Sequence, residues 1–407
     1  MSGPFGSSTF NHGVSAGGVY NDVVNQSLRF NDDDTAYLNK TPSSGGNRTT
    51  FTLSCWVKRS NLGEQTILDA FEDDQNRTRL MIDSGNRFQL FQRLSNADHS
   101  LICNAVSRDS SAWQNVIWAV DTTQSTAANR VKIYINGVQQ TFTGTGFPDQ
   151  NEDTFINHTV GHSIGSANDS GGRETYFDGY LADMNLIDGS QLTPASFGET
   201  KDGIWIPKDT GGLTFGTNGF RLQFKQTGTG TASASTIGAD TSGKTNHFTS
   251  NNLAATDSNI PDCPENNFAT MNPSFPGNSA VLSQGNLKIA TGGFSSSLYG
   301  VTSTFAIPKD KKIYIELECT DTDGSNFTAG FVTETSLRNG PGSSNVGSSG
   351  AIMCYNRSVD VNDTETDYGS SAGLGGLGVA KLAAGDILGC MIDGATGKVW
   401  FSRNGTY

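Results

Sequence analysis

Two Asn-Gly pairs, each beside a run of alternating apolar and polar residues, constrain this chain more than any other feature of its sequence. The first separates VKIYI from VQQTF within residues 131–142, and the second follows KVWFSR at residues 398–403. A two-residue hairpin loop of this kind needs positive φ at both positions, which Asn and Gly tolerate. Both pairs therefore predict β-hairpins, although only Thr406 and Tyr407 follow the second Gly.

The same alternation recurs in short segments along most of the chain. In FTLSCWVKR at residues 51–59 every second residue is apolar, which is the period of a strand with one buried face. The 407 residues include 49 Gly, and only 16% are charged, a composition typical of many short strands joined by tight turns. One short helix is predicted at LTPASFGE, with Thr193 as N-cap and Pro194 at the first helical position. The predicted fold class is all-β, with antiparallel sheets.

The balance of charges excludes two classes of partner. The chain carries a net charge of −13 and has no cluster of Lys and Arg. Nucleic acids and anionic membrane surfaces both select concentrated positive charge, so neither is an expected partner. No apolar run approaches the roughly 20 residues of a membrane span, so membrane insertion is not expected either. Residues 1–20 lack the basic start and apolar core of a signal peptide, which predicts synthesis in a cytoplasm.

The cysteines are scattered and show no Cys-x-x-Cys pair of the kind that binds zinc. Several lie in apolar strand segments, where a thiol behaves as a small hydrophobic group. Together with cytoplasmic synthesis, this favours buried free thiols over a disulfide framework. The six residues are Cys55, Cys103, Cys263, Cys319, Cys354 and Cys390.

Composition divides the chain into four parts. Residues 1–26 are rich in Gly, Ser and Asn, and are either a frayed tail or an anchoring arm that orders on a partner. Residues 27–207 form a first strand-dense block. Residues 208–285 are predicted to be a Gly/Asn/Pro-rich connector, with a few strands such as FRLQF and NHFTS added to the first domain. Residues 286–407 form a second strand-dense block.

Five segments of the first block follow one another in a set order: SLRFNDDDTAYL, FTLSCWVKRS, WQNVIWAVDTTQ, RVKIYINGVQQ and FDGYLADMNLIDGSQLTPASFG. In this order they resemble the laminin G-like, concanavalin A-like jelly-roll family. The resemblance covers about residues 27–205. It implies an antiparallel β-sandwich, and it implies calcium at loops, since such domains often bind calcium there.

The acidic turn FNDDDTAY is the predicted calcium site of this block. Asp32 and Asp34, with neighbouring carbonyl groups, offer the hard oxygen ligands that Ca²⁺ prefers. FEDDQN, with Glu72, Asp73 and Asp74, is a second loop of the same kind. The alternative for each loop is a solvated turn, because Asn and Asp favour turns without any ligand.

The second block contains KIYIELE and AGDILGCMIDGATGKVWFSRNG. These segments resemble a SPRY domain, which implies a second β-sandwich, whereas residues 320–380 match that family poorly. SPRY domains continue with further strands after the final Asn-Gly. We therefore expect this domain to be incomplete at Tyr407, with the partner strand of the last hairpin beyond it.

Two pairs of side chains are candidates for catalysis or metal binding. Glu316 and Glu318 share one face of a predicted strand, as a retaining glycosidase pair would, but their alternation is ordinary for a half-exposed strand. His158 and His162 lie four residues apart without a third ligand, and are expected to be solvent-facing or edge histidines. The chain also lacks the common catalytic motifs, so no catalytic residue is predicted.

The order of laminin G-like domain, connector and SPRY-like domain resembles virion proteins of tailed bacteriophages, particularly marine ones. This implies a non-enzymatic tail fibre or spike on the particle exterior that binds host surface glycans or a receptor. Residues 1–26 would anchor it to other virion proteins of the tail or capsid. The resemblance also implies a homo-oligomer, a trimer by analogy with fibres.

Two alternatives remain open: a capsid decoration or cement protein, and a polysaccharide-degrading enzyme. Copy number on the particle separates the decoration protein from a fibre. Tyr176, Tyr180 and Tyr368 are candidates for stacking on sugars, although at least two of them are expected to be buried or paired.

Overall fold

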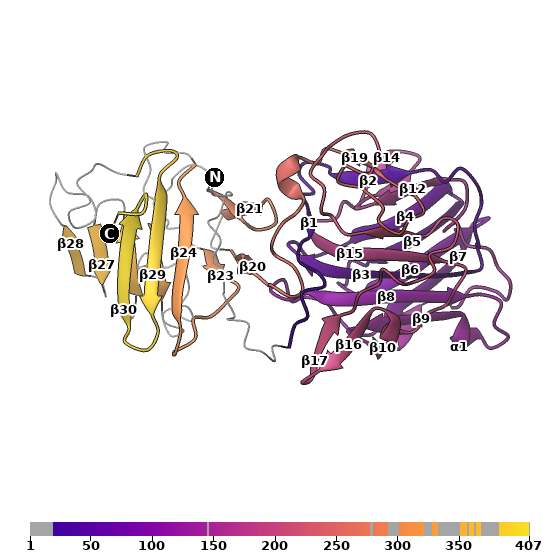
Figure 1. Cartoon of the computed structure of the whole chain (residues 1–407), viewed down its shortest axis with the longest axis horizontal. Coiled ribbons are helices and arrows are strands. Elements are labelled where there is room, and N and C mark those ends of the chain that lie inside the picture. Colours follow the sequence, from indigo (N-terminus) through magenta and orange to yellow (C-terminus); the bar gives the residue numbers. More distant parts are fainter. Residues whose placement is uncertain are drawn as a thin grey trace. The chain divides into compact units, whose positions relative to one another are not determined.

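The structure is a computed structural model that describes residues 19–144, 146–276, 280–291, 301–320, 328–332, 351–355, 358–361, 364–367 and 382–406 (Figure 1). The described chain divides into two compact units. The N-terminal unit comprises the described residues of 16–273 together with 282–288, and the C-terminal unit comprises the described residues of 274–281 and 289–406. None of the described helices is long and apolar enough to cross a membrane.

The first sheet of the N-terminal unit has seven strands in the order β1-β15-β3-β8-β9-β10, with β18 also paired to β15. All of these neighbours are antiparallel. The strands are β1 (Leu28–Phe30), β3 (Thr50–Arg59), β8 (Gln114–Asp121), β9 (Val131–Ile135), β10 (Val138–Gln139), β15 (Gly179–Asp188) and β18 (Phe220–Leu222).

The second sheet has eight strands in the order β11-β7-β6-β5-β4-β12-β2-β19, again with antiparallel neighbours. Together the two sheets form the predicted sandwich. The strands are β2 (Tyr37–Lys40), β4 (Gln65–Asp73), β5 (Asn76–Ile82), β6 (Phe88–Leu94), β7 (Ala97–Cys103), β11 (Phe142–Gly144), β12 (Gly161–Ile164) and β19 (Thr249–Asn251).

The main core lies between the two sheets and draws on the alternate residues of both. Leu53, Leu80, Leu90 and Trp118 are all inaccessible to solvent in this cluster. Trp118 meets Phe88 edge to face, with ring centroids 5.8 Å apart. Burial of each such side chain contributes roughly 1.5–3 kcal/mol, so this core is the main source of stability in the unit.

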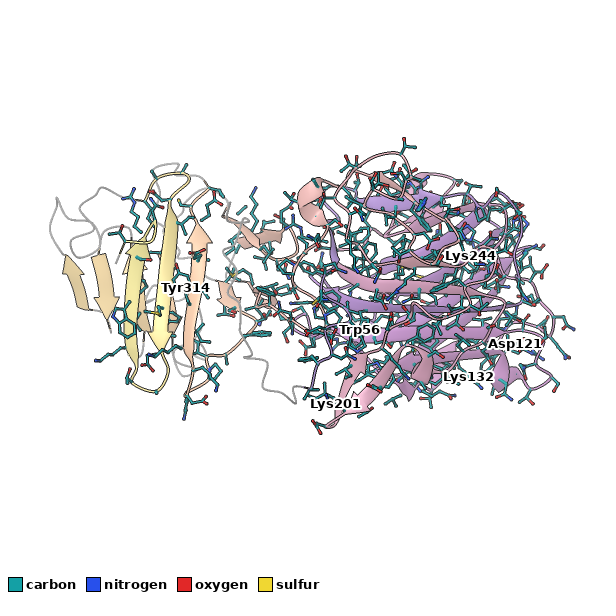
Figure 2. The ribbon with its side chains drawn as sticks, viewed as in Figure 1. Trp56, Asp121, Lys132, Lys201, Lys244 and Tyr314 are labelled. Atoms are coloured by element: carbon teal, nitrogen blue, oxygen red, sulfur yellow. The ribbon has the colours of Figure 1, made fainter. Side chains whose placement is uncertain are left out.

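The outer face of the first sheet is also covered, which the alternation did not predict. Trp56 (Figure 2) and Lys58 lie on the face opposite Leu53. They are nevertheless only 4% and 1% exposed. Trp56 and Tyr180 belong to a second apolar cluster with Cys263 from the 208–285 segment. A third cluster covers the same sheet around Ile117 and Phe215. Strands β3 and β15 are therefore buried on both faces.

The covering layer consists largely of the residues predicted to form a connector. Strand β18 pairs with β15, and β19 pairs with β2, as the sequence suggested for FRLQF and NHFTS. Lys58 attaches the layer to the sheet. Its Nζ donates to Asp262 Oδ2 at 2.7 Å, to Asn267 Oδ1 at 2.8 Å and to the Phe268 carbonyl at 2.7 Å. We call Lys58 and these three partners the lysine clamp. Trp113 Nε1 donates to the second oxygen of Asp262 at 2.9 Å.

Residues 21–24 are held to this layer by one side chain. The two carboxylate oxygens of Glu265 accept hydrogen bonds from four consecutive main-chain amides, those of Asn21, Asp22, Val23 and Val24, at 2.6–3.0 Å. Of the predicted anchoring arm, residues 1–18 lie outside the described residues. The part that is described docks on the unit that follows it.

The first Asn-Gly pair forms the predicted hairpin between β9 and β10. Asn136 and Gly137 have φ values of 48° and 77°, and Val138 pairs with Ile135. The hairpin also carries a tertiary contact, because a Cβ on Gly137 would lie 2.6 Å from Cζ3 of Trp205. Trp205 belongs to the hairpin of β16 (Gly198–Lys201) and β17 (Ile204–Pro207), which packs beside this turn.

Replacing Gly137 by Ala is expected to lower the free energy of unfolding by about 2–3 kcal/mol. An alanine there would have to adopt a left-handed backbone conformation, and its Cβ would also clash with the Trp205 ring, so the two costs add. Gly203 is a matched control, because its φ is +80° but no atom lies within 4 Å of the place that a Cβ would take. Gly203→Ala should therefore cost only about 1 kcal/mol in urea unfolding. Equal losses in the two variants would contradict the role given to Trp205.

Helical structure in the described chain is brief. The predicted helix at LTPASFGE is a single 3₁₀ turn, η1 (Pro194–Ser196), with Pro at its start as predicted. Thr193 occupies the N-cap position, as predicted, although its side chain makes no capping hydrogen bond. The chain cannot extend the helix because Gly198 already begins β16. The other helical segments are α1 (Ala127–Arg130) and η2 (Ala255–Asp257). A separate small hairpin is formed by β13 (Ala167–Asp169) and β14 (Gly172–Glu174).

The C-terminal unit is also antiparallel β-structure. Its described core contains Leu388 and Cys390, with Phe401 packed against them. The second Asn-Gly pair forms a turn, with φ values of 49° and 79° at Asn404 and Gly405. The sheets are β24-β29-β30 and β25-β26-β27-β28, and the strands are β24 (Lys312–Glu318), β25 (Thr328–Val332), β26 (Ala351–Tyr355), β27 (Ser358–Val361), β28 (Thr364–Asp367), β29 (Ile387–Asp393) and β30 (Lys398–Arg403).

Two further strand pairs lie in the region where the units adjoin in sequence: β20 (Met271–Pro276) with β23 (Val301–Ser303), and β21 (Ala280–Ser283) with β22 (Lys288–Thr291). The SPRY-like character of residues 286–407, and its continuation after Tyr407, stay predictions.

Cys55, Cys103 and Cys263 are buried free thiols, as predicted, and Cys319 and Cys390 are buried as well. Burial raises the pKa of Cys103 and of Cys263 to about 12, which keeps both thiols protonated and unreactive. The side chain of Cys354 lies outside the described residues.

Candidate functional site

The predicted calcium residues lie in the turn between β1 and β2, but their side chains have different partners. Asp34 Oδ2 accepts a hydrogen bond from Gln284 Nε2 at 3.0 Å. Asp32 Oδ1 accepts one from the Asp33 amide at 2.9 Å. Asp34 and Gln284 also line an open groove with residues 252–254, 256 and 257. Within the described chain, no three His, Cys, Asp or Glu side chains converge as metal ligands, so calcium at Asp32 and Asp34 stays a prediction.

A third carboxyl group lies at this turn and was missed by the sequence analysis. Asp178 is only 5% exposed, and its Oδ1 has no hydrogen-bond partner among the described residues. Burial, and next the charges of Asp32 and Asp33, raise the pKa of Asp178 to about 8. No local signal in FDGY marks this residue, because its neighbours in the turn are about 145 residues earlier in the chain.

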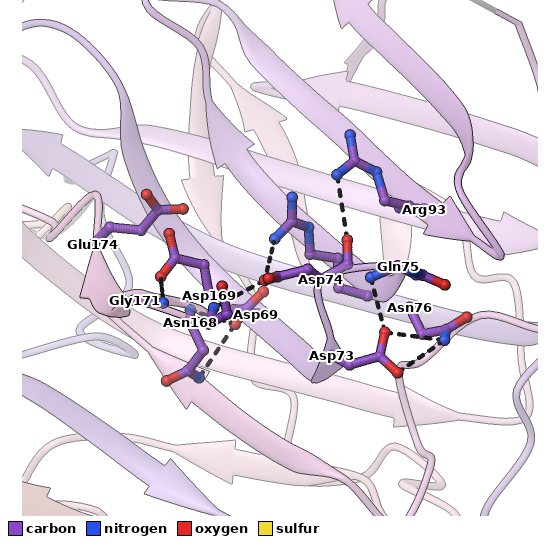
Figure 3. A network of polar contacts seen from close by, with 12 residues as sticks. Asp69, Asp73, Asp74, Gln75, Asn76, Arg93, Asn168, Asp169, Gly171 and Glu174 are labelled. Carbon is purple, nitrogen blue, oxygen red and sulfur yellow. Dashed lines mark hydrogen bonds and ion pairs between the residues drawn. The ribbon is translucent and has the colours of Figure 1, made fainter.

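The second acidic loop, FEDDQN, uses its carboxylates to hold its own turn and the neighbouring hairpin (Figure 3). Asp73 accepts hydrogen bonds from the Gln75 amide at 2.8 Å and from Asn76 Nδ2 at 3.0 Å. Asp74 Oδ1 accepts from the Ser170 amide at 2.9 Å. These bonds favour the structural alternative for this loop.

The outer face of the second sheet carries a set of arginines that the sequence analysis also missed. Strand register places Arg77 between Phe71 and Arg93, and Arg79 between Asp69 and Phe91. Phe71 aside, these residues point outward from the sheet. We call the five of them the arginine face: Asp69, Arg77, Arg79, Phe91 and Arg93. Its sequence signal is present in NRTRL, where two arginines at i and i+2 of a strand must share a face.

One half of the arginine face is an ion-pair network that fastens the β13–β14 hairpin to the sheet. Arg79 Nε lies 3.2 Å from Asp69 Oδ1, and its Nη1 lies 3.0 Å from Glu174 Oε1. The Asn168 amide donates to Asp69 Oδ2 at 2.9 Å. Burial raises the pKa of Asp69 to about 6, against the opposing effect of Arg79. The polar groups of this half are therefore already occupied.

The other half presents an aromatic ring between two guanidinium groups. The guanidinium carbons of Arg77 and Arg93 lie 5.8 and 5.6 Å from the Phe91 ring centroid. Arg93 is held by Asp98 through two bonds, at 2.6 and 2.9 Å. Arg77 has no partner for its buried Nε among the described residues, and its Nη1 lies 3.7 Å from Asp74 Oδ1. Arg77 therefore retains unused hydrogen-bond donors.

Desolvation by burial lowers the pKa of Arg77, and the neighbouring charges of Arg79 and Arg93 lower it further. Guanidinium groups also lie over aromatic rings elsewhere on this sheet face: Arg173 lies 3.6 Å above the Tyr37 ring. Phe91 itself is half-buried, so part of its ring reaches solvent. The face combines a flat apolar surface with directed donors.

The remaining predicted residues do not form a site. His162 is 3% exposed, so its expected solvent position is wrong: it is buried on β12, and burial lowers its pKa to about 4. His158 precedes that strand and packs against Phe155. On β24, which carries Tyr314 (Figure 2), Glu316 accepts a hydrogen bond from the Tyr314 hydroxyl at 2.7 Å, whereas Glu318 is exposed.

Of the candidate tyrosines for sugar stacking, Tyr180 is 1% exposed and donates to the Gly285 carbonyl at 2.8 Å, so it is buried and paired. Tyr176 is half-buried, and Tyr368 lies outside the described residues.

The comparison with protein families agrees with this architecture. Residues 31–196 match the family model described as the concanavalin A-like lectin/glucanases superfamily. No curated protein sequence matches the chain significantly. Among solved structures, the native heptameric SAP-like pentraxin of Limulus polyphemus is 17% identical, with 42% of this chain and 80% of that chain covered and a TM-score of 0.33.

Two further solved structures show likenesses of the same order. The CBM40 module of the Ruminococcus gnavus IT-sialidase, bound to α2,6-sialyllactose, is 14% identical over 44% of this chain and 94% of that chain, with a TM-score of 0.29. The LG1–3 region of the laminin α2 chain is 12% identical over 42% of this chain and 33% of that chain, with a TM-score of 0.32. The family match and the two antiparallel sheets show that residues 31–196 have the concanavalin A-like jelly-roll fold.

Proposed function

We propose that this chain is a non-enzymatic structural protein that binds glycans through the arginine face of its laminin G-like domain. The observation that carries the proposal is the partly exposed Phe91 ring between Arg77 and Arg93 on a sheet face. The first sheet offers no comparable surface among the described residues, because its outer face is buried under the covering layer.

The chemistry of the face suits a sugar. The apolar C–H face of a pyranose stacks on an aromatic ring, and its hydroxyl groups accept hydrogen bonds from guanidinium donors. The donor that Arg77 offers to a sugar is Nη1, which lies 3.7 Å from Asp74 Oδ1, whereas its Nε is buried. The acidic neighbours Asp74 and Asp98 offset the arginine charges, which favours hydroxyl-rich ligands over strongly anionic ones. A shallow site of this kind binds weakly, so repeated copies would supply avidity.

A binding variant tests the site. Phe91→Ala is expected to weaken binding to the best glycan found on an array by at least about tenfold, since loss of a stacking ring removes roughly 1.5 kcal/mol or more. Trp400→Ala is the control, because Trp400 is 38% exposed on β30 and belongs to the other unit. Circular dichroism should confirm that both variants are folded. Unchanged binding in Phe91→Ala, or an equal loss in Trp400→Ala, would place the site elsewhere.

The biological setting that we propose is a tailed-bacteriophage particle, with the chain as a tail fibre or spike on its exterior. The support is the order of segments in the sequence, namely a laminin G-like domain, an Asn/Gly/Pro-rich region and a SPRY-like block. The N-terminal residues would dock on other virion proteins, and a homotrimer would present several arginine faces to host glycans. A capsid decoration protein is the second candidate.

Locating the chain in a particle reconstruction tests this setting. A few to a few dozen copies at the tail support a tail fibre. Hundreds of copies over the head would instead show a capsid decoration protein. Incubation with host surface polysaccharide tests the enzymatic alternative. We expect no new reducing ends, and their appearance would overturn the non-enzymatic assignment.

A further inference from the structure

The lysine clamp brings together an amine, a carboxylate and a carboxamide. Lys58 Nζ lies 2.7 Å from Asp262 Oδ2 and 2.8 Å from Asn267 Oδ1. Because a C=O bond is about 1.2 Å long, the side-chain carbonyl carbon Cγ of Asn267 lies within about 4 Å of Nζ. The clamp therefore places a nucleophile beside both a base that can take its proton and a carbon that it can attack.

The surroundings of Lys58 favour the neutral amine, which is the nucleophilic form. The side chain is buried, and its Nζ lies 5.9 Å from the centroid of the buried Tyr180 ring. Burial lowers the pKa of Lys58, although the charge of Asp262 opposes that effect. Trp113 Nε1 donates to Asp262 Oδ1 at 2.9 Å and so holds the carboxylate in place. Transfer of a proton from Lys58 to Asp262 removes two buried charges at once, which lowers its cost in this apolar site.

The carboxamide of Asn267 is oriented by different partners at its two ends. Its Oδ1 accepts from Lys58 Nζ, and its Nδ2 donates to the Ser111 carbonyl at 2.7 Å. Unlike the buried Lys58 and Asp262, Asn267 is only half-buried. Ammonia released from Nδ2 would therefore have a route to solvent.

We propose that Lys58 and Asn267 form an intramolecular isopeptide bond, with Asp262 as the catalytic residue. Asp262 takes a proton from the Lys58 ammonium, and the free amine attacks Cγ of Asn267. The Nζ–Cγ bond forms and the Cγ–Nδ2 bond breaks, while Asp262 gives its proton to Nδ2 and takes the surplus proton from Nζ. That last proton leaves with the ammonia as ammonium.

The reaction balances without any oxidant, cofactor or other co-reactant. One ammonium group and one carboxamide become one secondary amide and one ammonium ion. The hydrogen bonds of the lysine clamp are those of the chain before this reaction. Afterwards, the covering layer would be joined to strand β3 by a covalent bond in place of an ion pair.

A second contact between a lysine and an asparagine lacks the base and serves as an internal control. Lys40 Nζ lies 2.5 Å from Asn246 Oδ1. Asp240 is near enough to act on the Lys40 charge, yet among the described residues no carboxylate forms an ion pair with Lys40. Lys40 is also half-buried, so its ammonium form is better solvated than that of Lys58. We therefore expect no bond at Lys40.

Mass spectrometry of the full chain tests the proposal. We expect the wild-type chain, shown to be folded by circular dichroism and then denatured for the measurement, to be lighter than its sequence by one ammonia molecule. After proteolysis, tandem mass spectrometry should find a cross-linked peptide pair that joins Lys58 to Asn267, and none that joins Lys40 to Asn246. A folded wild-type chain without the Lys58–Asn267 pair would overturn the proposal.

Two variants make the test specific. Asn267→Ala keeps the ion pair between Lys58 and Asp262 but cannot form the bond, so it should show its full mass. Its Tm should be lower than that of the wild type by about 10 °C or more, because the bond joins positions 209 residues apart. Asp262→Asn should also show its full mass, since it lacks the base, and a cross-linked pair in this variant would remove Asp262 from the reaction.

Succinimide formation at the Asn136–Gly137 pair would also release ammonia, and the same variants separate it from the bond. Such a loss would persist in Asn267→Ala and would give no cross-linked peptide pair. A wild-type chain and an Asn267→Ala chain that both lack one ammonia, without a cross-linked pair in either, would therefore count against the isopeptide bond.

Discussion

Replacing Asp262 by Ala is expected to lower the free energy of unfolding of the N-terminal unit by about 3–5 kcal/mol, since it leaves a buried ammonium without its counter-ion. Lys58 is 1% exposed and Asp262 is 4% exposed, with Nζ and Oδ2 2.7 Å apart. Burial lowers the pKa of Lys58, and Asp262 opposes that effect. The variant also removes the acceptor of Trp113 Nε1.

Urea unfolding followed by tryptophan fluorescence measures this loss. The double variant Lys58→Met/Asp262→Leu is the informative control, because replacing both charges with apolar groups is often close to neutral. It should recover the part of the loss that comes from the unpaired ammonium, while the part that comes from the unsatisfied Trp113 Nε1 remains. A loss below about 1 kcal/mol in Asp262→Ala would mean that the covering layer is not fastened by this clamp.

The second large effect is expected at Asp188, the last residue of β15. Its Oδ1 accepts from the Asn47 amide at 2.7 Å and from Asn157 Nδ2 at 3.1 Å, and its Oδ2 accepts from the Asn218 amide at 2.9 Å. Asp188 is 8% exposed. Asp188→Ala would leave these donors unsatisfied, at about 1–3 kcal/mol each when buried, so we expect a total loss of about 3–4 kcal/mol.

Asp188→Asn is the matched variant for this site. It has nearly the same shape and keeps one acceptor oxygen, so we expect roughly half of the loss. In the same urea denaturation measurement, the free energy of unfolding should be highest for the wild type, lower for the Asn variant and lowest for the Ala variant. An Asn variant as unstable as the Ala variant would show that the negative charge, rather than the hydrogen bonds, joins the three loops.

The parts of the fold that depend on local rules were predictable from the sequence. Asn136 and Gly137 form the expected turn because positive φ is a property of those two residues. Val131 and Ile133 face the main core because a strand alternates its side chains. The concanavalin A-like jelly-roll fold of residues 31–196 could be predicted because its segments keep their order along the chain.

The parts that depend on contacts distant in sequence were not predictable. Alternation shows that two faces of β3 differ, but not that Trp56 and Lys58 are covered by residues some 200 positions later. Asp178 meets Asp32 only because β1 pairs with β15. Arg77 lies beside Arg93 through the β5–β6 register, which requires the structure even though the Arg-x-Arg spacing shows that Arg77 and Arg79 share a face.

The clasp of Glu265 on residues 21–24 determines how tension would travel through the molecule. A pull on the chain before Asn21 acts on four short hydrogen bonds, which four main-chain amides donate to one carboxylate. From Glu265 the load passes along the backbone to Asp262 and, through Lys58, into the middle of the first sheet. Mechanical force is thereby shared across interior strands instead of peeling β1, a three-residue edge strand, away from its neighbour.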